Sequence, residues 1–308
     1  MLSNYRGKKM KHNFLSILDL SKGEQLEIFN LADMGKDIFK NYSHSLDGMV
    51  LASLFFQPST RTQFSFQSAF LKLGGSIIEC ADINETRSGA PYYEPIGDMA
   101  RIISNYSDIV VMRTENNLQT VEMDANIEIP FISAGSGNIE HPTQALTDLY
   151  TVRQYFGVLE SHDILIIGTP RQRTINSFIK GMSLWAKQNY HILCQEGVCI
   201  NKDVKKSLGK SNVTYYSSWD DIYESGIYKN ISIIYMDKFF YETNRHSIYV
   251  PDEKMFKTHF SKEAIILHPL PRTQELPCFF DDLNNAKYFV QAKNGLYIRS
   301  GLFLHYLL

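Results

Sequence analysis

Long apolar runs are absent from this chain of 308 residues, and their absence excludes one class of protein. No stretch approaches the ~18 apolar residues that a membrane-spanning helix needs. The basic N-terminal segment MLSNYRGKKMKHNF is not followed by an apolar run and therefore does not resemble a signal peptide. We expect a protein without a membrane partner, located in the cytoplasm.

Cysteine is also scarce. The four cysteines are scattered, and none belongs to a CxxC pair: Cys80, Cys194, Cys199 and Cys278. In a chain of this size they predict buried free thiols in a reducing compartment. The sequence offers no cluster of ligands suited to zinc, so we expect neither a metal nor a cofactor.

An excess of charge of either sign is missing as well. The 31 basic and 33 acidic residues leave a net charge of -2. This balance argues against a nucleic-acid partner and against a polybasic membrane anchor. The net charge does not exclude a local basic pocket for an anionic substrate, because it averages over such a pocket.

What the chain does contain is an ordinary globular composition, with 44% hydrophobic and 21% charged residues. Its length fits two domains of roughly 150 residues each. Short apolar runs alternate with longer amphipathic ones, which is typical of parallel sheets covered by helices on both faces. We therefore predict an α/β fold with two doubly wound parallel-sheet domains.

The predicted strands are short, rich in Ile, Val and aromatic residues, and bounded by Gly, Asp or Asn. They cover residues 49–56, 76–80, 108–113, 129–134, 163–168, 191–194, 213–216, 231–236 and 264–267. The predicted helices cover about 22–39, 62–73, 94–106, 141–156 and 293–308. Ser21 and Glu24 form a capping box before the first of these, and the fourth connects the domains. The predicted domains are residues 1–140 and 141–292, with the last helix packing back on the first domain.

The first motif that carries chemistry is PSTRT, between a predicted strand and a predicted helix. A helix start presents unpaired backbone N–H groups and the positive end of the helix dipole, so it binds anions. Ser59, Thr60, Arg61 and Thr62 add donors that suit phosphate oxygens. The alternative is that Ser59 or Thr60 only caps the helix.

The second motif is HPTQ, again at a helix start. His141 and Gln144 lie three residues apart, so both side chains can face one site. A neutral His can donate to a polarised carbonyl oxygen, and a Gln can bond an amide. The alternative is a helix cap or a buried histidine of the core.

The third motif is HPLPR, directly after a predicted strand. Pro269 and Pro271 remove two backbone donors and fix the turn. The turn leaves carbonyl oxygens available to a substrate NH2 group, and we predict a cis bond between Leu270 and Pro271. The alternative is a rigid turn that binds no ligand.

PSTRT, HPTQALTDLYT and LHPLPR, in this order and at these spacings, resemble the aspartate and ornithine carbamoyltransferase family. The resemblance covers nearly the whole chain, and the HPLPR motif and the tail QAKNGLYIRSGLFL are closest to its aspartate branch. It implies two α/β domains with the active site in the cleft between them. It also implies a homotrimer with shared sites and the formation of N-carbamoyl-L-aspartate and phosphate in pyrimidine biosynthesis. Whether regulatory chains bind stays open.

The resemblance also implies roles for individual residues. Carbamoyl phosphate would be bound by Ser59, Thr60, Arg61, Thr62, Arg113, His141, Gln144 and the carbonyls of Pro269 and Leu270. Among these, Arg61, Thr62, Arg113 and His141 would be catalytic. The acceptor would be bound by Arg173, Lys238, Leu270 and Pro271. Each of the three arginines has a surface ion pair as its alternative.

Two segments depart from the family pattern. The aspartate branch has a loop with a Ser and a Lys that a neighbouring subunit donates. Here Ser88 stands for the serine, Arg87 is the available cation, and Tyr92 occupies the lysine position. The alternative is an exposed loop in which Arg87 has no role. The branch also grips aspartate with an Arg-x-Gln, at whose positions this chain has Lys238 and Phe240. Lysine keeps the charge but lacks the two-pronged geometry of arginine.

Because of these departures, the sequence does not determine which amine is the acceptor substrate. The main hypothesis is an aspartate carbamoyltransferase-type enzyme. The alternatives are a carbamoyltransferase for another amine and an impaired relative that binds carbamoyl phosphate without turnover. A dinucleotide-binding protein is disfavoured, because the turn after DILIIG lacks the GxGxxG pattern.

Overall fold

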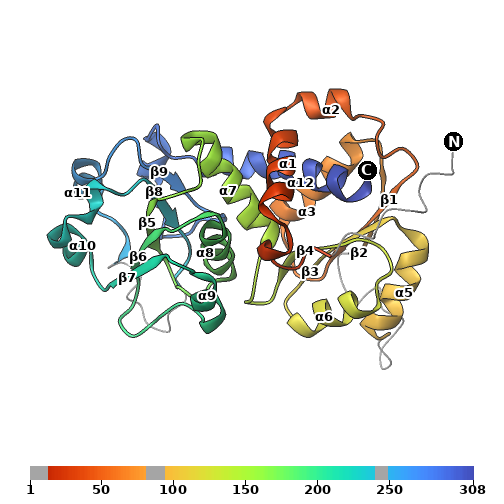
Figure 1. Ribbon diagram of the computed structural model, residues 1–308, viewed down its shortest axis with the longest axis horizontal. Helices are drawn as coiled ribbons and strands as arrows, with labels where there is room; N and C mark the ends of the chain where they lie inside the picture. Colours follow the sequence, from red (N-terminus) through yellow and green to blue (C-terminus); the bar gives the residue numbers. More distant parts are fainter. Residues whose placement is uncertain (1–12, 81–93, 240–248) are drawn as a thin grey trace. The chain divides into compact units, whose positions relative to one another are not determined.

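The computed structural model describes residues 13–80, 94–239 and 249–308. It divides into two compact units, which are residues 1–137 with 296–308, and residues 138–295. Each unit contains a parallel β-sheet with helices on both of its faces (Figure 1). In the described part of the chain, no helix is both long enough and apolar enough to cross a membrane.

The sheet of the first unit has the strand order β2-β1-β3-β4. Its strands are β1 (Val50–Phe55), β2 (Ser76–Cys80), β3 (Ile109–Thr114) and β4 (Phe131–Ser136). Its helices are α1 (Lys22–Asp33), α2 (Asp37–Asn41), α3 (Thr60–Lys72), α5 (Ile96–Tyr106) and α6 (Asn117–Asn126). All strand pairs are parallel, as the predicted alternation of strands and helices requires.

Two separate layers of side chains cover this sheet. On one face, Met99 of α5 and Met123 of α6 pack against Val110 and Met112 of β3. On the other side of the unit, Phe66 of α3 lies edge-on to Phe303 with ring centroids 5.7 Å apart. Phe303 belongs to α12 (Tyr288–Leu307), whose residues from 296 onward are part of this unit.

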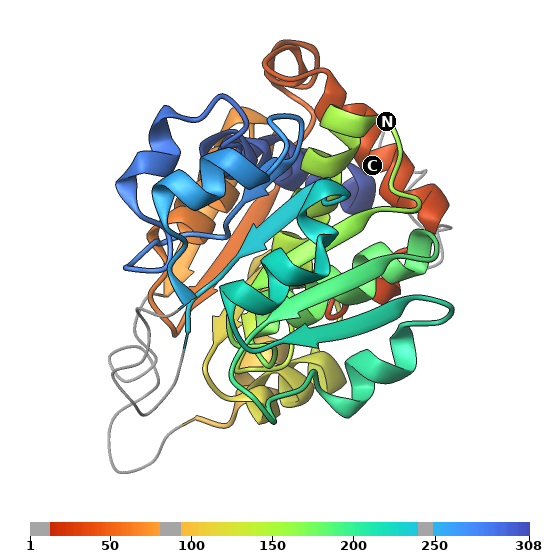
Figure 2. The ribbon, with the colours of Figure 1, turned by 90° about the vertical axis from the view of Figure 1, so that its left-hand side faces the viewer.

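The sheet of the second unit has the strand order β7-β6-β5-β8-β9 (Figure 2). Its strands are β5 (Asp163–Ile167), β6 (Asn189–Leu193), β7 (Asn212–Tyr216), β8 (Ile233–Met236) and β9 (Ile265–Leu267). Its helices, besides the first part of α12, are α7 (Pro142–Phe156), α8 (Arg173–Trp185), α9 (Lys202–Ser207), α10 (Trp219–Ser225) and α11 (Glu253–His259). Short 3₁₀ turns are Ile17–Asp19, Ile227–Lys229 and Cys278–Asp282.

Strand β8 shows why its sequence IIYM is apolar throughout. Ile234 and Met236 pack with Phe256 of α11 on one face. Tyr235 points to the other face and stacks on Phe178 of α8, with ring centroids 4.3 Å apart. Because both faces of a parallel sheet are covered, a central strand loses the alternation of apolar and polar residues.

Two predictions about local structure were wrong. The first predicted helix ends at Asp33 rather than continuing to residue 39, because Gly35 adopts a left-handed backbone (φ 55°) before α2 begins. The cysteines are free, but only Cys194 is fully buried, while Cys199 and Cys278 are exposed. These two lie in a surface loop and at the start of a surface turn, where a thiol gains no cover from the core.

Candidate functional site

The winding of the first sheet singles out the ends of β1 and β3. From β1 the chain moves outward to β2 and then returns to β3 on the other side of β1. Ligands of open α/β sheets bind beyond the carboxyl ends of the strands at such a reversal. Ser59 to Thr62 follow β1, and Arg113 lies at the end of β3, so both segments border this point.

The start of α3 has the features of an anion site. Ser59 occupies the N-cap position, but its side chain makes no capping hydrogen bond, so the simple capping role does not account for it. Arg61 is exposed, and no carboxylate in the described ranges forms an ion pair with it. The first-turn N–H groups, the helix dipole and this guanidinium can therefore act together on an anion.

Backbone pairing connects Arg113 to the same segment. Arg113 is the register partner of Phe55, the last residue of β1. Its carbonyl accepts the N–H groups of Phe56 at 3.0 Å and of Gln57 at 3.3 Å, which extends the pairing toward Ser59. The half-buried guanidinium donates from Nη1 to the carbonyl of Ala134 at 3.2 Å. The ladder thus fixes the end of β3 beside the chain that leads into α3.

In the second unit, α7 begins at the HPTQ motif. His141 is the N-cap residue and Pro142 is the first helical residue, a position that proline favours. The His141 side chain is buried and makes no capping bond, while its backbone N–H donates to the hydroxyl of Ser177 at 2.9 Å. The buried ion pair of Glu140 and Lys180, at 2.6 Å, fixes this helix start to α8.

The HPLPR turn has the carbonyls that its sequence predicts. The bond between Leu270 and Pro271 is cis, and Leu270 has a left-handed backbone (φ 53°) that is rare for a branched side chain. The N–H of Leu270 donates to Nδ1 of His268 at 2.8 Å. No described residue donates to the carbonyl of Pro269 or of Leu270. Two acceptors are therefore available at this turn. By contrast, Arg272 pairs with Asp281 at 2.6 Å.

The second sheet reverses its winding between β5 and β8, and the predicted acceptor residues lie there. Arg173 begins α8, in the segment that follows β5, and Lys238 follows β8. The N–H of Thr169 donates to the carbonyl of Lys238 at 3.3 Å, which joins the two turns. Asp237 accepts the hydroxyl of Thr174 and, at 2.7 Å, the N–H of Lys238, and burial raises its pKa. The Asp237 carboxyl group therefore links the turn after β8 to the start of α8.

The second unit also contains a cavity of about 270 Å³. It is lined by Phe239, Thr273, Gln274 and Glu275. Glu275 is buried, accepts two bonds from Thr273 and receives Nε2 of His268 at 3.0 Å. These bonds outweigh the effect of burial and lower the pKa of Glu275 to about 2.

Four of the predicted positions lie outside the described residues: Arg87, Ser88, Tyr92 and Phe240. Their roles stay predictions. A buried polar group in the second unit, which consists of Asp148, Tyr235 and Gln291, was not predicted from the sequence. The one available signal was the spacing of Gln144 and Asp148, four residues apart on one helix face.

Comparison with known proteins agrees with this arrangement. The carbamoyl-P binding domain of aspartate/ornithine carbamoyltransferase matches residues 12–154, and the Asp/Orn binding domain of the same family matches residues 160–306. The chain belongs to the aspartate/ornithine carbamoyltransferase family. The predicted family and enzyme class, a carbamoyltransferase, are thereby confirmed.

Relatives within this carbamoyltransferase family carry the name of its aspartate branch. The aspartate carbamoyltransferase catalytic subunit of Clostridium acetobutylicum is 36% identical over 297 residues, covering 92% of this chain and 94% of that protein. The corresponding subunit of Picrophilus torridus is 36% identical over 303 residues, covering 95% and 97%. These names favour the main hypothesis over a different acceptor.

Solved structures of the family share the fold. The catalytic subunit of M. jannaschii aspartate transcarbamoylase has a TM-score of 0.79 at 29% identity, covering 97% of this chain and 98% of that one. The aspartate transcarbamoylase of Trypanosoma cruzi in complex with aspartate and phosphate has a TM-score of 0.84 at 25% identity, covering 97% and 95%. The predicted α/β fold with two parallel sheets is confirmed.

Proposed function

We propose that this carbamoyltransferase transfers the carbamoyl group of carbamoyl phosphate to L-aspartate, which yields N-carbamoyl-L-aspartate and phosphate. The observation that carries the proposal is the anion site of the first unit, where Arg113 and the start of α3 border one reversal of the sheet. A doubly negative phosphoryl group needs such a combination of helix N–H groups and guanidinium groups.

In this proposal the first unit supplies the phosphate ligands, Ser59 to Thr62 and Arg113. The second unit supplies the groups for the carbamoyl end, which are His141, Gln144 and the carbonyls of Pro269 and Leu270. The availability of these two carbonyls in the described structure supports their role as acceptors for the NH2 group. The buried location of His141 supports a role in polarising the carbamoyl oxygen.

The acceptor ligands are Arg173 and Lys238, with Leu270 and Pro271 beside them. Both cations follow strands that border the reversal of the second sheet. Aspartate carries two carboxylates, and two cations match its charge. Lys238 offers one of these carboxylates a point charge in place of the paired donors of an arginine, which predicts a weaker grip on aspartate.

The chemistry follows from the charges. The aspartate amine attacks the carbamoyl carbon and forms a C–N bond, and negative charge develops on the carbamoyl oxygen. Donors directed at that oxygen stabilise the charge, and loss of one good donor typically costs about 2.7–4 kcal/mol. The C–O bond to the phosphate then breaks, the leaving phosphate takes up the proton that the amine loses, and the arginine groups stabilise it. Binding both substrates together supplies much of the remaining acceleration.

A panel of amines tests this function. The purified protein is incubated with carbamoyl phosphate and each amine, and phosphate release is measured. We expect turnover of L-aspartate far above that of ornithine and other amino acids. Preferred turnover of another amine would identify a different acceptor, and binding of carbamoyl phosphate without turnover of any amine would indicate an impaired relative. Absence of carbamoyl phosphate binding in calorimetry would contradict the proposal as a whole.

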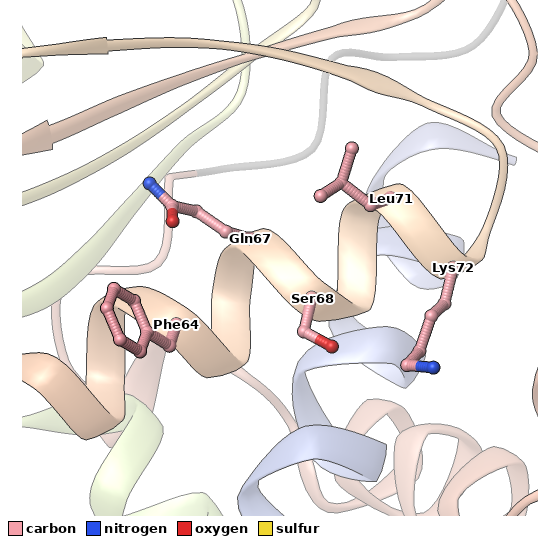
Figure 3. A pocket seen from close by; sticks show the side chains of 5 residues that line it. All are labelled: Phe64, Gln67, Ser68, Leu71 and Lys72. Atoms are coloured by element: carbon pink, nitrogen blue, oxygen red, sulfur yellow. The ribbon is translucent and has the colours of Figure 1, made fainter.

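We also propose that the chain assembles into a homotrimer. The outer face of α3 exposes two large apolar side chains, Phe64 (61%) and Leu71 (56%), that line one surface hollow, and apolar side chains gathered in one patch favour an interaction surface. Figure 3 shows these side chains with Gln67, Ser68 and Lys72, around a surface hollow of about 450 Å³. A second copy of the chain is the occupant that family membership supports.

Sedimentation equilibrium tests the assembly. Phe64→Glu is expected to shift the protein from trimer toward monomer, because the buried interface would have to accommodate a charge. Leu118→Glu is the matched control, since Leu118 on α6 is 73% exposed and lies outside this hollow. A monomeric wild-type protein, or equal effects of the two variants, would contradict this part of the proposal.

A further inference from the structure

Asp148 on α7 is a fully buried carboxyl group to which the proposed reaction assigns no role. Its Oδ1 atom accepts the Nε2 groups of Gln144 at 2.7 Å and of Gln291 at 2.6 Å. Its Oδ2 atom accepts the hydroxyl of Tyr235 at 2.9 Å. Three donors from α7, α12 and β8 thus meet on one carboxyl group in the interior of the second unit.

The backbone decides which way Gln291 faces. The N–H of His268 lies 2.9 Å from the side-chain amide of Gln291, and a backbone N–H can only donate. The amide atom that faces His268 must therefore be the carbonyl Oε1, although amide oxygen and nitrogen are otherwise hard to distinguish. The NH2 group of Gln291 is consequently directed at Asp148.

Through Asp148, the orientation of the Gln291 amide fixes the orientation of the Gln144 amide. The Oδ1 atom of Asp148 receives the NH2 of Gln291 and so is an acceptor, which requires Gln144 to present its own NH2 to the same atom. The carbonyl oxygen of Gln144 is then turned away from Asp148. No residue in the described ranges donates to that oxygen, so it remains available to a ligand.

We propose that Asp148 and Gln291 are positioning residues that orient the Gln144 amide, so that its carbonyl oxygen accepts the NH2 of a carbamoyl group. This inference rests on the proposed function, which assigns Gln144 to the carbamoyl end of the substrate. The same Gln291 carbonyl holds the N–H of His268, the residue that begins the turn with the other two acceptors. The Gln291 side chain therefore helps to orient the acceptor on α7 and the acceptors of the turn after β9.

This arrangement recognises an amino group. Acetyl phosphate has a methyl group where carbamoyl phosphate has NH2, so it cannot donate to any of these acceptors. The ratio of the two dissociation constants, acetyl phosphate over carbamoyl phosphate, measures how well the acceptors are oriented. Substitution of a residue that only supports the fold would weaken the binding of both ligands equally and leave this ratio unchanged.

A double-mutant cycle with Asp148→Asn and Gln291→Met tests the proposal. In Asp148→Asn, Gln291 still dictates that the new amide turns its carbonyl toward the two glutamines. In Gln291→Met, a carboxylate at position 148 is still only an acceptor. Each single variant should therefore keep the ratio within about twofold. In the double variant, neither atom of the amide at position 148 is fixed toward Gln144. Where its NH2 group faces Gln144, the Gln144 carbonyl turns away from the ligand, so the ratio should fall by more than twofold and by at most about tenfold, the usual effect of one hydrogen bond.

Calorimetric titration with the two acyl phosphates gives the dissociation constants. The titration is done at about pH 8, because burial raises the pKa of Asp148 to about 7 and its carboxyl group is mostly ionised above that pH. Asn294→Ala is the matched control. Asn294 lies one turn further along α12 and donates to Thr151 at 3.0 Å and to Gln154 at 2.7 Å, but not to the Asp148 group. It should leave the ratio unchanged, alone and combined with Asp148→Asn.

The outcomes separate the possible failures. If the double variant keeps the wild-type ratio, or if Asn294→Ala lowers it equally, the positioning role is wrong while carbamoyl phosphate binding stands. If the wild-type protein binds neither phosphate, the proposed function is wrong and this inference with it. Should the double variant not fold in thermal melting, Asp148→Leu makes the same test. Leucine offers Gln144 no acceptor, so the ratio should again fall by more than twofold and by at most about tenfold.

Discussion

Nε2 of His268 lies 3.0 Å from Oε1 of Glu275, and both side chains are buried in the second unit. The N–H of Leu270 donates to the other ring nitrogen of His268, so Nε2 carries the hydrogen and donates to the carboxylate. Glu275 also accepts the backbone N–H of Thr273 at 2.8 Å. The conformation of the HPLPR turn and the ionisation of Glu275 are therefore linked.

This link predicts a pH-dependent loss of stability in acid. The pKa of Glu275 is lowered from 4.5 to about 2 in the folded protein, so its contribution is present above the unfolded pKa and is lost as pH falls toward 2. Glu275→Gln should lower the free energy of unfolding by about 2–3 kcal/mol above about pH 5, and by progressively less at lower pH. Urea unfolding at several pH values measures this, with the exposed Glu263→Gln as control. A difference that does not change with pH would contradict it.

Asp148 predicts the opposite trend. Burial raises its pKa to about 7 in spite of three hydrogen bonds, so the folded state holds a proton that the unfolded chain releases at lower pH. Its contribution is complete below the unfolded pKa of about 4 and is lost as pH rises through about 7. Asp148→Asn should therefore gain stability relative to wild type between about pH 4 and pH 8, by about 2–4 kcal/mol. Thermal or urea unfolding checks this, and Asn294→Ala should show a difference that is constant with pH.

Removal of the Arg61 guanidinium tests the anion site of the first unit. Arg61→Ala should lower kcat/KM for carbamoyl phosphate by about 10–150-fold, since a hydrogen bond to a charged group contributes about 1.5–3 kcal/mol. Arg101→Ala is the matched control, because Arg101 is an exposed arginine on α5 that binds Asn126 and lies near Asp98. Phosphate release under initial-rate conditions is the measurement. Equal activity of the two variants would exclude Arg61 from the site.

Gly168 offers a test of the acceptor end. Its backbone has φ 151°, and a Cβ atom there would lie 2.8 Å from the carbonyl oxygen of Asp237, so Gly168→Ala must displace the turn that carries Lys238. We expect KM for aspartate to rise about tenfold or more, with a small change in KM for carbamoyl phosphate. Gly157→Ala is the control, because Gly157 has φ 73° and open space around its Cβ position. Its strain of about 1–2 kcal/mol should lower stability without changing either KM.

Much of the fold followed from the sequence. All nine predicted strands are present, from β1 at Val50–Phe55 to β9 at Ile265–Leu267, because short apolar runs bounded by turn residues are a local signal. The capping box of Ser21 and Glu24 is present as well. The end of the first helix was missed, because the left-handed conformation of Gly35 competes with an otherwise helical pattern.

The candidate site divides in the same way. The motifs around Arg61, His141 and Pro269 could be identified because each is contiguous in the sequence and stands at the end of a predicted strand or the start of a predicted helix. Asp148 could not be assigned a partner, since Gln291 is separated from it by 143 residues and amide groups carry no distinctive pattern. Nor could the sequence indicate that Asp237 is committed to Thr174 rather than to a ligand.

By itself, the sequence determined the strands, the order of the motifs and the family, because these depend on residues close to one another along the chain. Only the tertiary structure decided which strands are neighbours, and hence that the motifs proposed to bind phosphate and acceptor border the reversals of the two sheets. It also decided the direction of the Gln144 amide, through bonds from distant elements. Hydrogen-bond polarity is a property of atoms that meet in space, and no local pattern encodes it.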